Sequence, residues 1–230
     1  MVTTHAYKNL GHTNYGWLDA RYHFSFASYY NPNRMGFGVL RVINDDVIKA
    51  GSGFDTHSHK NMEIITYVRK GAITHKDSNG NIGRTVAGDV QIMSAGAGIS
   101  HSEFNYENED TSLYQIWIEP NRLEVSPRWD SYEFPKIPTT DELSLLVSGN
   151  GSAPLTIHQD AFIYAGHLLE GTQVNQKVKH QAYILVSEGK IEIEGELLNE
   201  GDGLEVKSIS SINIKAQRDS KVLVIDVPQS

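Results

Sequence analysis

The chain has 230 residues, with 28 Asp plus Glu against 20 Lys plus Arg, ten His and no Cys. This length suffices for one large domain or two smaller ones, each with its own core. The absence of Cys excludes disulfides, thiolate metal sites and a Cys nucleophile, and the formal charge of −8 argues against a nucleic-acid partner. Any chemistry must therefore rest on His, carboxylates and hydroxyls.

Neither a signal peptide nor a membrane span is visible in the sequence. The amino terminus has no apolar core of the signal-peptide type. No apolar stretch is long enough to cross a bilayer. We therefore expect a cytoplasmic protein without membrane association.

Short β-rich segments follow one another along the chain, separated by turn pairs such as Asn79-Gly80 and Asn150-Gly151. Many short strands at close spacing predict a β-sandwich or barrel. The best helical candidate is residues 140–146. The expected strands are residues 37–43, 63–68, 89–93, 114–118, 183–186, 190–194, 211–215 and 221–227.

The sequence changes character near its middle. Residues 133–142 contain two Pro and no sustained hydrophobic pattern, which is typical of a linker. We predict an N-terminal domain over residues 1–134, a linker over 135–142 and a C-terminal domain over 143–230.

The two halves also share an order of elements. A strand runs into Gly71 in the first half and into Gly189 in the second, and a Gly-Asp pair follows at Gly88 and at Gly201. This weak internal repeat predicts two related β-barrels.

Two pairs of metal-ligating residue types stand out. His57 and His59 are two residues apart, as are His101 and Glu103, so in extended strands each pair faces one side. If the two segments are neighbouring strands, three imidazoles and one carboxylate meet inside a barrel. Such a set suits Fe(II), Ni(II), Cu(II), Mn(II) or Zn(II) and leaves a coordination position open for catalysis. An isolated H-x-H is usually only a pair of surface histidines, but two such pairs beside Gly-rich turns favour a metal site.

The spacing around these residues resembles the two cupin motifs. The segment from Gly51 to Glu63 has the pattern G-x5-H-x-H-x3-E of the first motif, and Gly98, His101 and Asn105 have the ending G-x2-H-x3-N of the second. The Pro expected in the second motif is Gly96. With this departure, the chain resembles the pirin branch of the cupins. The resemblance to pirins is carried by residues 18–32, 35–46, 57–68, 75–81 and 88–105.

This resemblance implies an all-β fold of two tandem cupin (jelly-roll) barrels, a bicupin. It places one divalent metal ion in the N-terminal domain. Glu63, a ligand in many other cupins, is not counted among the metal ligands here and is expected to support the ligands or the strand pairing instead. Asn175 and Lys177 stand where the C-terminal domain would carry ligands, so that domain is expected to lack them. The implied metal ligands are His57, His59, His101 and Glu103.

Other residues near the motifs receive more modest roles. Four apolar residues flank the expected ligands and are candidates to line an apolar pocket, with simple barrel packing as the alternative. His75 is expected to form structural hydrogen bonds, and the three Trp to lie in the core. The candidate pocket residues are Phe54, Met62, Met93 and Phe104.

The resemblance to pirins implies quercetin 2,3-dioxygenase activity, in which a flavonol ring is opened with O2 and CO is released. Glu103 would serve both as ligand and as general base toward the flavonol 3-hydroxyl, and the metal as a Lewis acid. Fe(II) is the expected ion, with Cu, Ni, Mn and Zn compatible. The expected partners are a flavonol-like substrate and O2, and the expected state is a monomer.

Two alternatives remain open at this point. In the first, the metal switches a protein-binding surface with its redox state, without physiological flavonol turnover. In the second, the metal is purely structural. A cavity that reaches the metal from outside distinguishes the enzyme from the switch.

Overall fold

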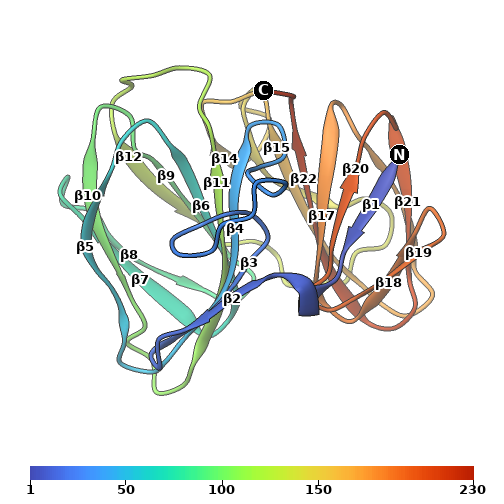
Figure 1. The fold of residues 1–230 in the computed structure, drawn as a ribbon, viewed down its shortest axis with the longest axis horizontal. Coiled ribbons are helices and arrows are strands. Elements are labelled where there is room, and N and C mark those ends of the chain that lie inside the picture. The colour runs from blue at the N-terminus through green and yellow to red at the C-terminus, as the bar shows by residue number, and fades with distance from the viewer. The chain divides into compact units, whose positions relative to one another are not determined.

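The computed structural model describes all 230 residues, and strands make up nearly all of its regular structure (Figure 1). This confirms the all-β prediction. The single helical turn is the 3-10 segment η1 (Tyr7–Asn9), and no helix is long and apolar enough to cross a membrane. The cytoplasmic location stays a prediction. The helical candidate at residues 140–146 is wrong: strand β13 (Ser144–Ser148) begins inside it, because this segment pairs with β15 (Phe162–Leu168).

The chain folds into two compact units. The N-terminal unit comprises Gly11–Phe134 and Pro154–Gln159, and the C-terminal unit comprises Met1–Leu10, Pro135–Ala153 and Asp160–Ser230. These units differ from the predicted division in three short segments: residues 1–10, the predicted linker 135–142, which belongs to the C-terminal unit, and residues 154–159. Residues 1–10 join the C-terminal unit because β1 (Val2–His5) pairs with β20 (Gly203–Val206).

The N-terminal unit consists of a seven-stranded sheet, in the order β12-β9-β6-β11-β4-β3-β2, and a four-stranded sheet, in the order β5-β10-β7-β8 (Figure 1). Neighbouring strands pair antiparallel. The strands are β2 (Gly11–Asn14), β3 (Leu18–Tyr22), β4 (Leu40–Ile48), β5 (Gly53–His59), β6 (Glu63–Lys70), β7 (Ala72–Asp77), β8 (Ile82–Val86), β9 (Val90–Ser94), β10 (Ile99–Phe104), β11 (Thr111–Ile118) and β12 (Arg128–Tyr132).

The C-terminal unit has the corresponding architecture. One sheet contains the order β1-β20-β17-β22-β15-β13, and a smaller sheet has the order β16-β21-β18-β19. The expected repeat is visible in these orders and in the matching turns, where Gly71 and Gly189 both have positive φ (72° and 90°). The remaining strands are β14 (Leu155–Thr156), which belongs to the N-terminal unit, and β16 (Gln173–Lys177), β17 (Gln181–Glu188), β18 (Lys190–Ile193), β19 (Glu196–Asn199), β21 (Ser211–Ala216) and β22 (Ser220–Val227).

The interiors of the two units differ in chemistry. The C-terminal interior is filled by Val, Ile and Leu side chains such as Val174, Ile184 and Ile214, whereas Asn175 and Lys177 are exposed on β16. Both units bury some polar side chains, such as Asp226 in the C-terminal unit, but the N-terminal unit buries more of them beside its apolar ones. Burying such groups is unfavourable unless they are hydrogen-bonded or bind a ligand, so this interior is where a functional site is expected. Its buried polar side chains include Asn44, Asp46, Thr66, His75, Gln91, His101, Glu103 and Gln115.

Candidate metal centre

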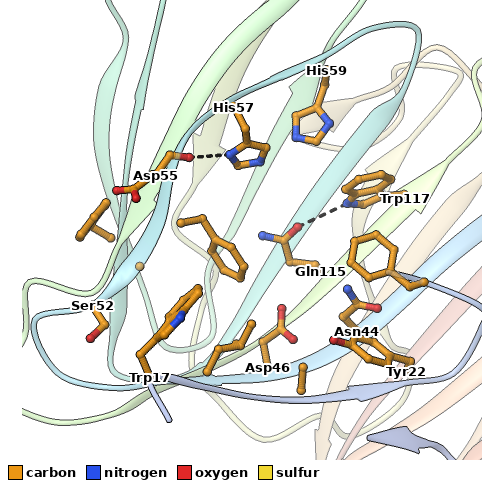
Figure 2. Close-up of a pocket in the computed structure, with 16 residues that line it drawn as sticks. Trp17, Tyr22, Asn44, Asp46, Ser52, Asp55, His57, His59, Gln115 and Trp117 are labelled. Atoms are coloured by element: carbon orange, nitrogen blue, oxygen red, sulfur yellow. Dashed lines mark hydrogen bonds between the residues drawn. The ribbon is translucent and has the colours of Figure 1, made fainter. Parts of the chain in front are cut away.

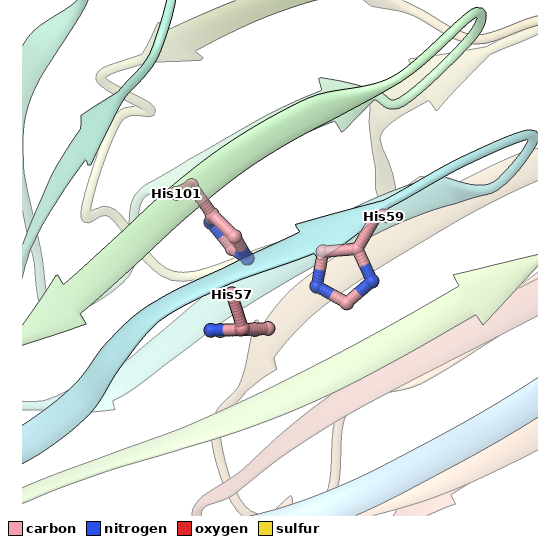
Figure 3. Close-up of side chains that lie close together, drawn as sticks. All are labelled: His57, His59 and His101. Atoms are coloured by element: carbon pink, nitrogen blue, oxygen red, sulfur yellow. The ribbon is translucent and has the colours of Figure 1, made fainter.

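Three imidazoles gather where β5 and β10 pair. His101 lies directly opposite His57 in the antiparallel register, and His59 follows two residues along β5. The ring centroids are 4.6 Å apart for His57 and His101, 4.8 Å for His57 and His59, and 4.9 Å for His59 and His101. One potential ligand atom from each residue lies within 4.8 Å of the others (Figure 3). A single ion fits between nitrogens at this spacing.

A bulge in β5 aims these side chains. The register moves from His101 opposite His57 to Glu103 opposite Phe54, so three steps on β5 match two on β10. The extra residue reverses the alternation of β5, which brings Phe54 to the same side as His57 and His59. The H-x-H spacing predicted the shared face of the two histidines, but nothing in the sequence marked the bulge.

Hydrogen bonds leave one nitrogen free on two of the rings. The Nδ1 of His57 lies 2.7 Å from the carbonyl oxygen of Asp55. A carbonyl only accepts, so Nδ1 carries the proton and Nε2 keeps its lone pair. The Nε2 of His101 is buried and has no hydrogen-bond partner. A metal ion bound at this nitrogen would satisfy it.

His101 is supported from behind by His75. Their Nδ1 atoms lie 3.4 Å apart, and the Nε2 of His75 lies 2.9 Å from Oδ2 of Asp77. When His75 donates Nε2–H to Asp77, its Nδ1 accepts the proton of His101 and the Nε2 lone pair of His101 is free. Trp129 stacks on His75 with centroids 5.0 Å apart. Such outer hydrogen bonds orient ligating histidines and set their tautomer.

The electrostatics keep His59 and His101 neutral. Burial, together with the neighbouring His57, lowers the pKa of His59 from 6.5 to about 4. Burial, followed by the nearby histidines, lowers the pKa of His101 to about 3. Metal binding requires neutral imidazole. These residues therefore fit a divalent metal ion with affinity for nitrogen ligands.

Glu103 lies deeper, in a network of amides. Its Oε1 accepts hydrogen bonds from Nε2 of Gln91 at 2.7 Å and from Oγ1 of Thr66 at 3.3 Å, and its Oε2 accepts from Nε2 of Gln115. The structure does not bring its carboxylate into the cluster formed by the three imidazoles. A carboxylate offers four lone pairs, so three donors leave one on Oε2. Burial raises the pKa of Glu103.

Glu63 is buried at a different place. Its Oε2 accepts a hydrogen bond from Oγ of Ser94 at 2.7 Å, and Glu63 and Ser94 are directly opposite in the pairing of β6 with β9. Burial raises its pKa, whereas Ser94 and Arg128 oppose the rise. It is not part of the cluster of three imidazoles, and its supporting role stays a prediction.

A cavity of about 690 Å³ opens beside the imidazoles, within the range typical of ligand pockets, roughly 300–1,000 Å³. His57 and His59 form part of its wall, and aromatic side chains form much of the rest (Figure 2). Glu103 is not among the lining residues, but Gln115, which donates to it, is. The aromatic lining residues are Trp17, Tyr22, Phe26, Phe54, Phe104 and Trp117.

The cavity corrects part of the sequence interpretation. Phe54 and Phe104 line it. Met93 does not, because it packs in a separate apolar cluster against which Met62 also lies. Trp17 and Trp117, expected in the core, line the cavity instead.

Among the lining residues that the sequence analysis missed are Asn44 and Asp46 on β4. The signal available for them was a polar pair of alternate residues at the end of the apolar segment 37–43.

Comparison with known proteins identifies the same architecture elsewhere. The family model named Pirin matches residues 3–118, and the model described as the quercetinase C-terminal cupin domain matches residues 145–227. A protein of Escherichia coli K12 named quercetin 2,3-dioxygenase is 45% identical over 221 residues, which is 95% of each chain.

Solved structures agree. The crystal structure of YhhW from Escherichia coli superposes with a TM-score of 0.95 at 43% identity, covering 100% of this chain and 99% of that one. The structure of the bacterial pirin YhhW in complex with nickel(II) has a TM-score of 0.93 at 42% identity and covers 100% of both chains. The expected bicupin fold is thereby confirmed.

Proposed function

The chain belongs to the pirin family, and on this premise we propose that it is a metal-dependent dioxygenase of the quercetin 2,3-dioxygenase type. The observation that carries the proposal is the cavity: about 690 Å³ of largely aromatic-lined space with His57 and His59 in its wall. A site that served only as a redox switch or a structural metal would need no such space. The relatives that bear the name quercetin 2,3-dioxygenase, at 45% identity, support the same reading.

The three imidazoles would hold the metal, with Glu103 as the proposed fourth ligand through its remaining lone pair. We propose Fe(II) as the resident ion; the nickel(II) in the YhhW structure belongs to that protein. A bound divalent ion would supply Lewis-acid chemistry at this end of the cavity.

The chain's own residues would bind and orient the substrate. Trp17, Phe26 and Trp117 offer flat apolar faces to a planar aromatic molecule. In the overall reaction one O2 is consumed, the central flavonol ring opens and CO leaves.

Glu103 is the proposed acceptor of the proton of the flavonol 3-hydroxyl. Burial raises its pKa, which makes Glu103 a stronger base than an exposed carboxylate. Gln115 lies at the cavity wall between the substrate and Glu103. This role therefore requires the Gln115 side chain either to move aside or to link the two through hydrogen bonds. Glu103→Gln should then lower turnover more than it lowers metal occupancy. Equal loss of both would reduce Glu103 to a ligand.

The deciding experiment measures quercetin consumption, followed by the loss of flavonol absorbance in air. Protein loaded with Fe(II) is compared with the same protein stripped by a chelator. Metal-dependent turnover supports the proposal. A preparation with one metal per chain and no turnover would refute it and favour a redox-sensing protein-binding module.

A further inference from the structure

The cavity has a second polar region that the metal chemistry does not use. Asn44 and Asp46 are alternate residues of β4, so both side chains point to the same face of the sheet and both line the cavity. They are 5% and 2% exposed. Figure 2 shows Gln115 between this pair and the two lining histidines.

Both side chains hold an oxygen without a hydrogen-bond partner. These are Oδ1 of Asn44 and Oδ1 of Asp46. The sheet neighbours of Asp46 carry no side-chain donor: Asp46 pairs with Ala20 on β3 and with Leu113 on β11. Ala20 is too short to cover the carboxyl group. A buried polar atom left unpaired destabilises a fold, and such sites persist where function uses them.

We propose that Asn44 and Asp46 form a hydroxyl-binding subsite that selects aromatic substrates carrying phenolic hydroxyls away from the ring that is opened. The inference rests on the proposed function and specifies its substrate class. Two acceptor oxygens two residues apart match the O–H donors of a hydroxylated ring. The aromatic walls would hold the ring between this pair and the imidazoles.

The charge environment agrees with a neutral ligand. Burial, followed by repulsion from Asp45 and Glu103, raises the pKa of Asp46 well above its ordinary value. A protonated carboxyl group both donates and accepts, which suits a phenol and disfavours a cationic ligand.

The test compares quercetin, which has hydroxyls on both outer rings, with 3-hydroxyflavone, which lacks them. Binding to the metal-loaded protein is measured without O2 by quenching of tryptophan fluorescence, since Trp17 and Trp117 line the cavity. The wild-type protein should bind quercetin more tightly by roughly 10-fold or more, because a site built for hydroxyls discriminates against ligands that lack them.

Two variants remove the acceptors while keeping similar volume, Asp46→Leu and Asn44→Leu. Each should reduce the preference for quercetin by roughly 10-fold and leave binding of 3-hydroxyflavone nearly unchanged. Their melting temperatures should stay the same or rise, since an unpaired buried oxygen is replaced by apolar atoms. A merely structural role would lower them. Asp110→Asn, an exposed carboxylate paired with Lys49, is the control for lost charge.

The outcomes separate the two proposals. Equal wild-type affinity for the two flavonols, or a preference that survives both Leu variants, overturns the subsite; metal-dependent turnover would still stand. Selective binding without turnover overturns the dioxygenase and keeps the subsite. If the Leu variants fail to fold, the wild-type protein and the milder Asp46→Asn variant still test the subsite. A wild-type ratio of one between the affinities for quercetin and 3-hydroxyflavone refutes it. A ratio that is undiminished in Asp46→Asn also refutes it.

Discussion

The amide network around Glu103 makes a sharp prediction, because Trp117 fixes the direction in which Gln115 donates its hydrogen bond. The Nε1–H of Trp117 only donates, and it lies 3.3 Å from Oε1 of Gln115. Gln115 must therefore turn its Nε2 toward Glu103. In the structure Oγ1 of Thr85 donates to Oε1 of Gln91 at 3.0 Å, and Nε2 of Gln91 faces Glu103. In this arrangement position 103 accepts at both of its terminal atoms.

Glu103→Gln breaks this pattern, because its new amide group must face one of the two amide donors. One buried charge-assisted hydrogen bond is lost, worth about 1.5–3 kcal/mol. Relief of the buried charge offsets part of that loss, since burial raises the pKa of Glu103. We expect the free energy of unfolding to fall by roughly 2 kcal/mol, and the melting temperature by about 4–8 °C for a chain of this size.

A charge swap supplies the control. In Glu103→Gln combined with Gln115→Glu, the carboxylate at position 115 accepts from Trp117 and from the new amide at position 103. That amide keeps its oxygen for Gln91. Gln115→Glu alone places a second carboxylate beside Glu103 and should be the least stable variant. The double variant should recover to within about 1 kcal/mol of wild type, a coupling of at least ~2 kcal/mol.

The assay is urea denaturation of the metal-free protein at pH 7, followed by tryptophan fluorescence. Additive effects in the double variant, or a Glu103→Gln protein within about 0.5 kcal/mol of wild type, would refute the assigned hydrogen-bond directions. The swapped protein also separates the role of Glu103 in folding from its role in metal binding, because it is expected to fold although the carboxylate is no longer at position 103. Lost metal affinity in a stable swapped protein would assign Glu103 to the ligand set.

Three further outcomes are expected. The metal-free protein should lose stability as pH falls from 6.5 toward 3, because the folded state keeps His59 (pKa about 4) and His101 (pKa about 3) neutral while the unfolded chain takes up protons; a denaturation series in which His101→Leu shows the same slope as wild type would contradict this. His75→Phe keeps an aromatic ring over Trp129 but removes the bond to His101, so the metal dissociation constant, measured by chelator competition, should rise roughly 10–100-fold; an unchanged constant would deny His75 its orienting role. Gly53→Ala drives a Cβ into the backbone of β10 and should lower stability by about 1–3 kcal/mol together with metal affinity. Gly80→Asn, at a turn with open space but a positive φ, should cost only the smaller strain of that backbone conformation and leave metal affinity unchanged, when both variants are melted with and without metal.

Much of the site was readable from local spacing. The period of two in a strand puts His57 and His59 on one face wherever the strand lies, and the same holds for His101 and Glu103. The antiparallel pairing of β5 with β10 was an assumption at that stage. The structure establishes this pairing, which the spacing alone could not fix.

Other features depended on contacts between segments far apart in the chain. Residues 1–10 belong to the C-terminal unit, and not to the N-terminal one as predicted, because β1 pairs with β20. Pairing partners of this kind are not encoded locally in the sequence. The pocket role given to Met93 was wrong because Met93 packs with Ile64 and Ile99 in a separate apolar cluster. Sequence proximity to a ligand does not say into which space a side chain points.

By itself, the sequence determined the strand-rich fold, the repeat, the family resemblance and the chemical types of the metal ligands, since each depends on residue identity and spacing over a few positions. Only the tertiary structure decided where the bulge in β5 aims the histidines, which amides hold Glu103, and that Asn44 and Asp46 face a cavity. Those properties arise from register between strands that lie tens of residues apart, and a register shift of one residue turns a side chain from the interior to the opposite face.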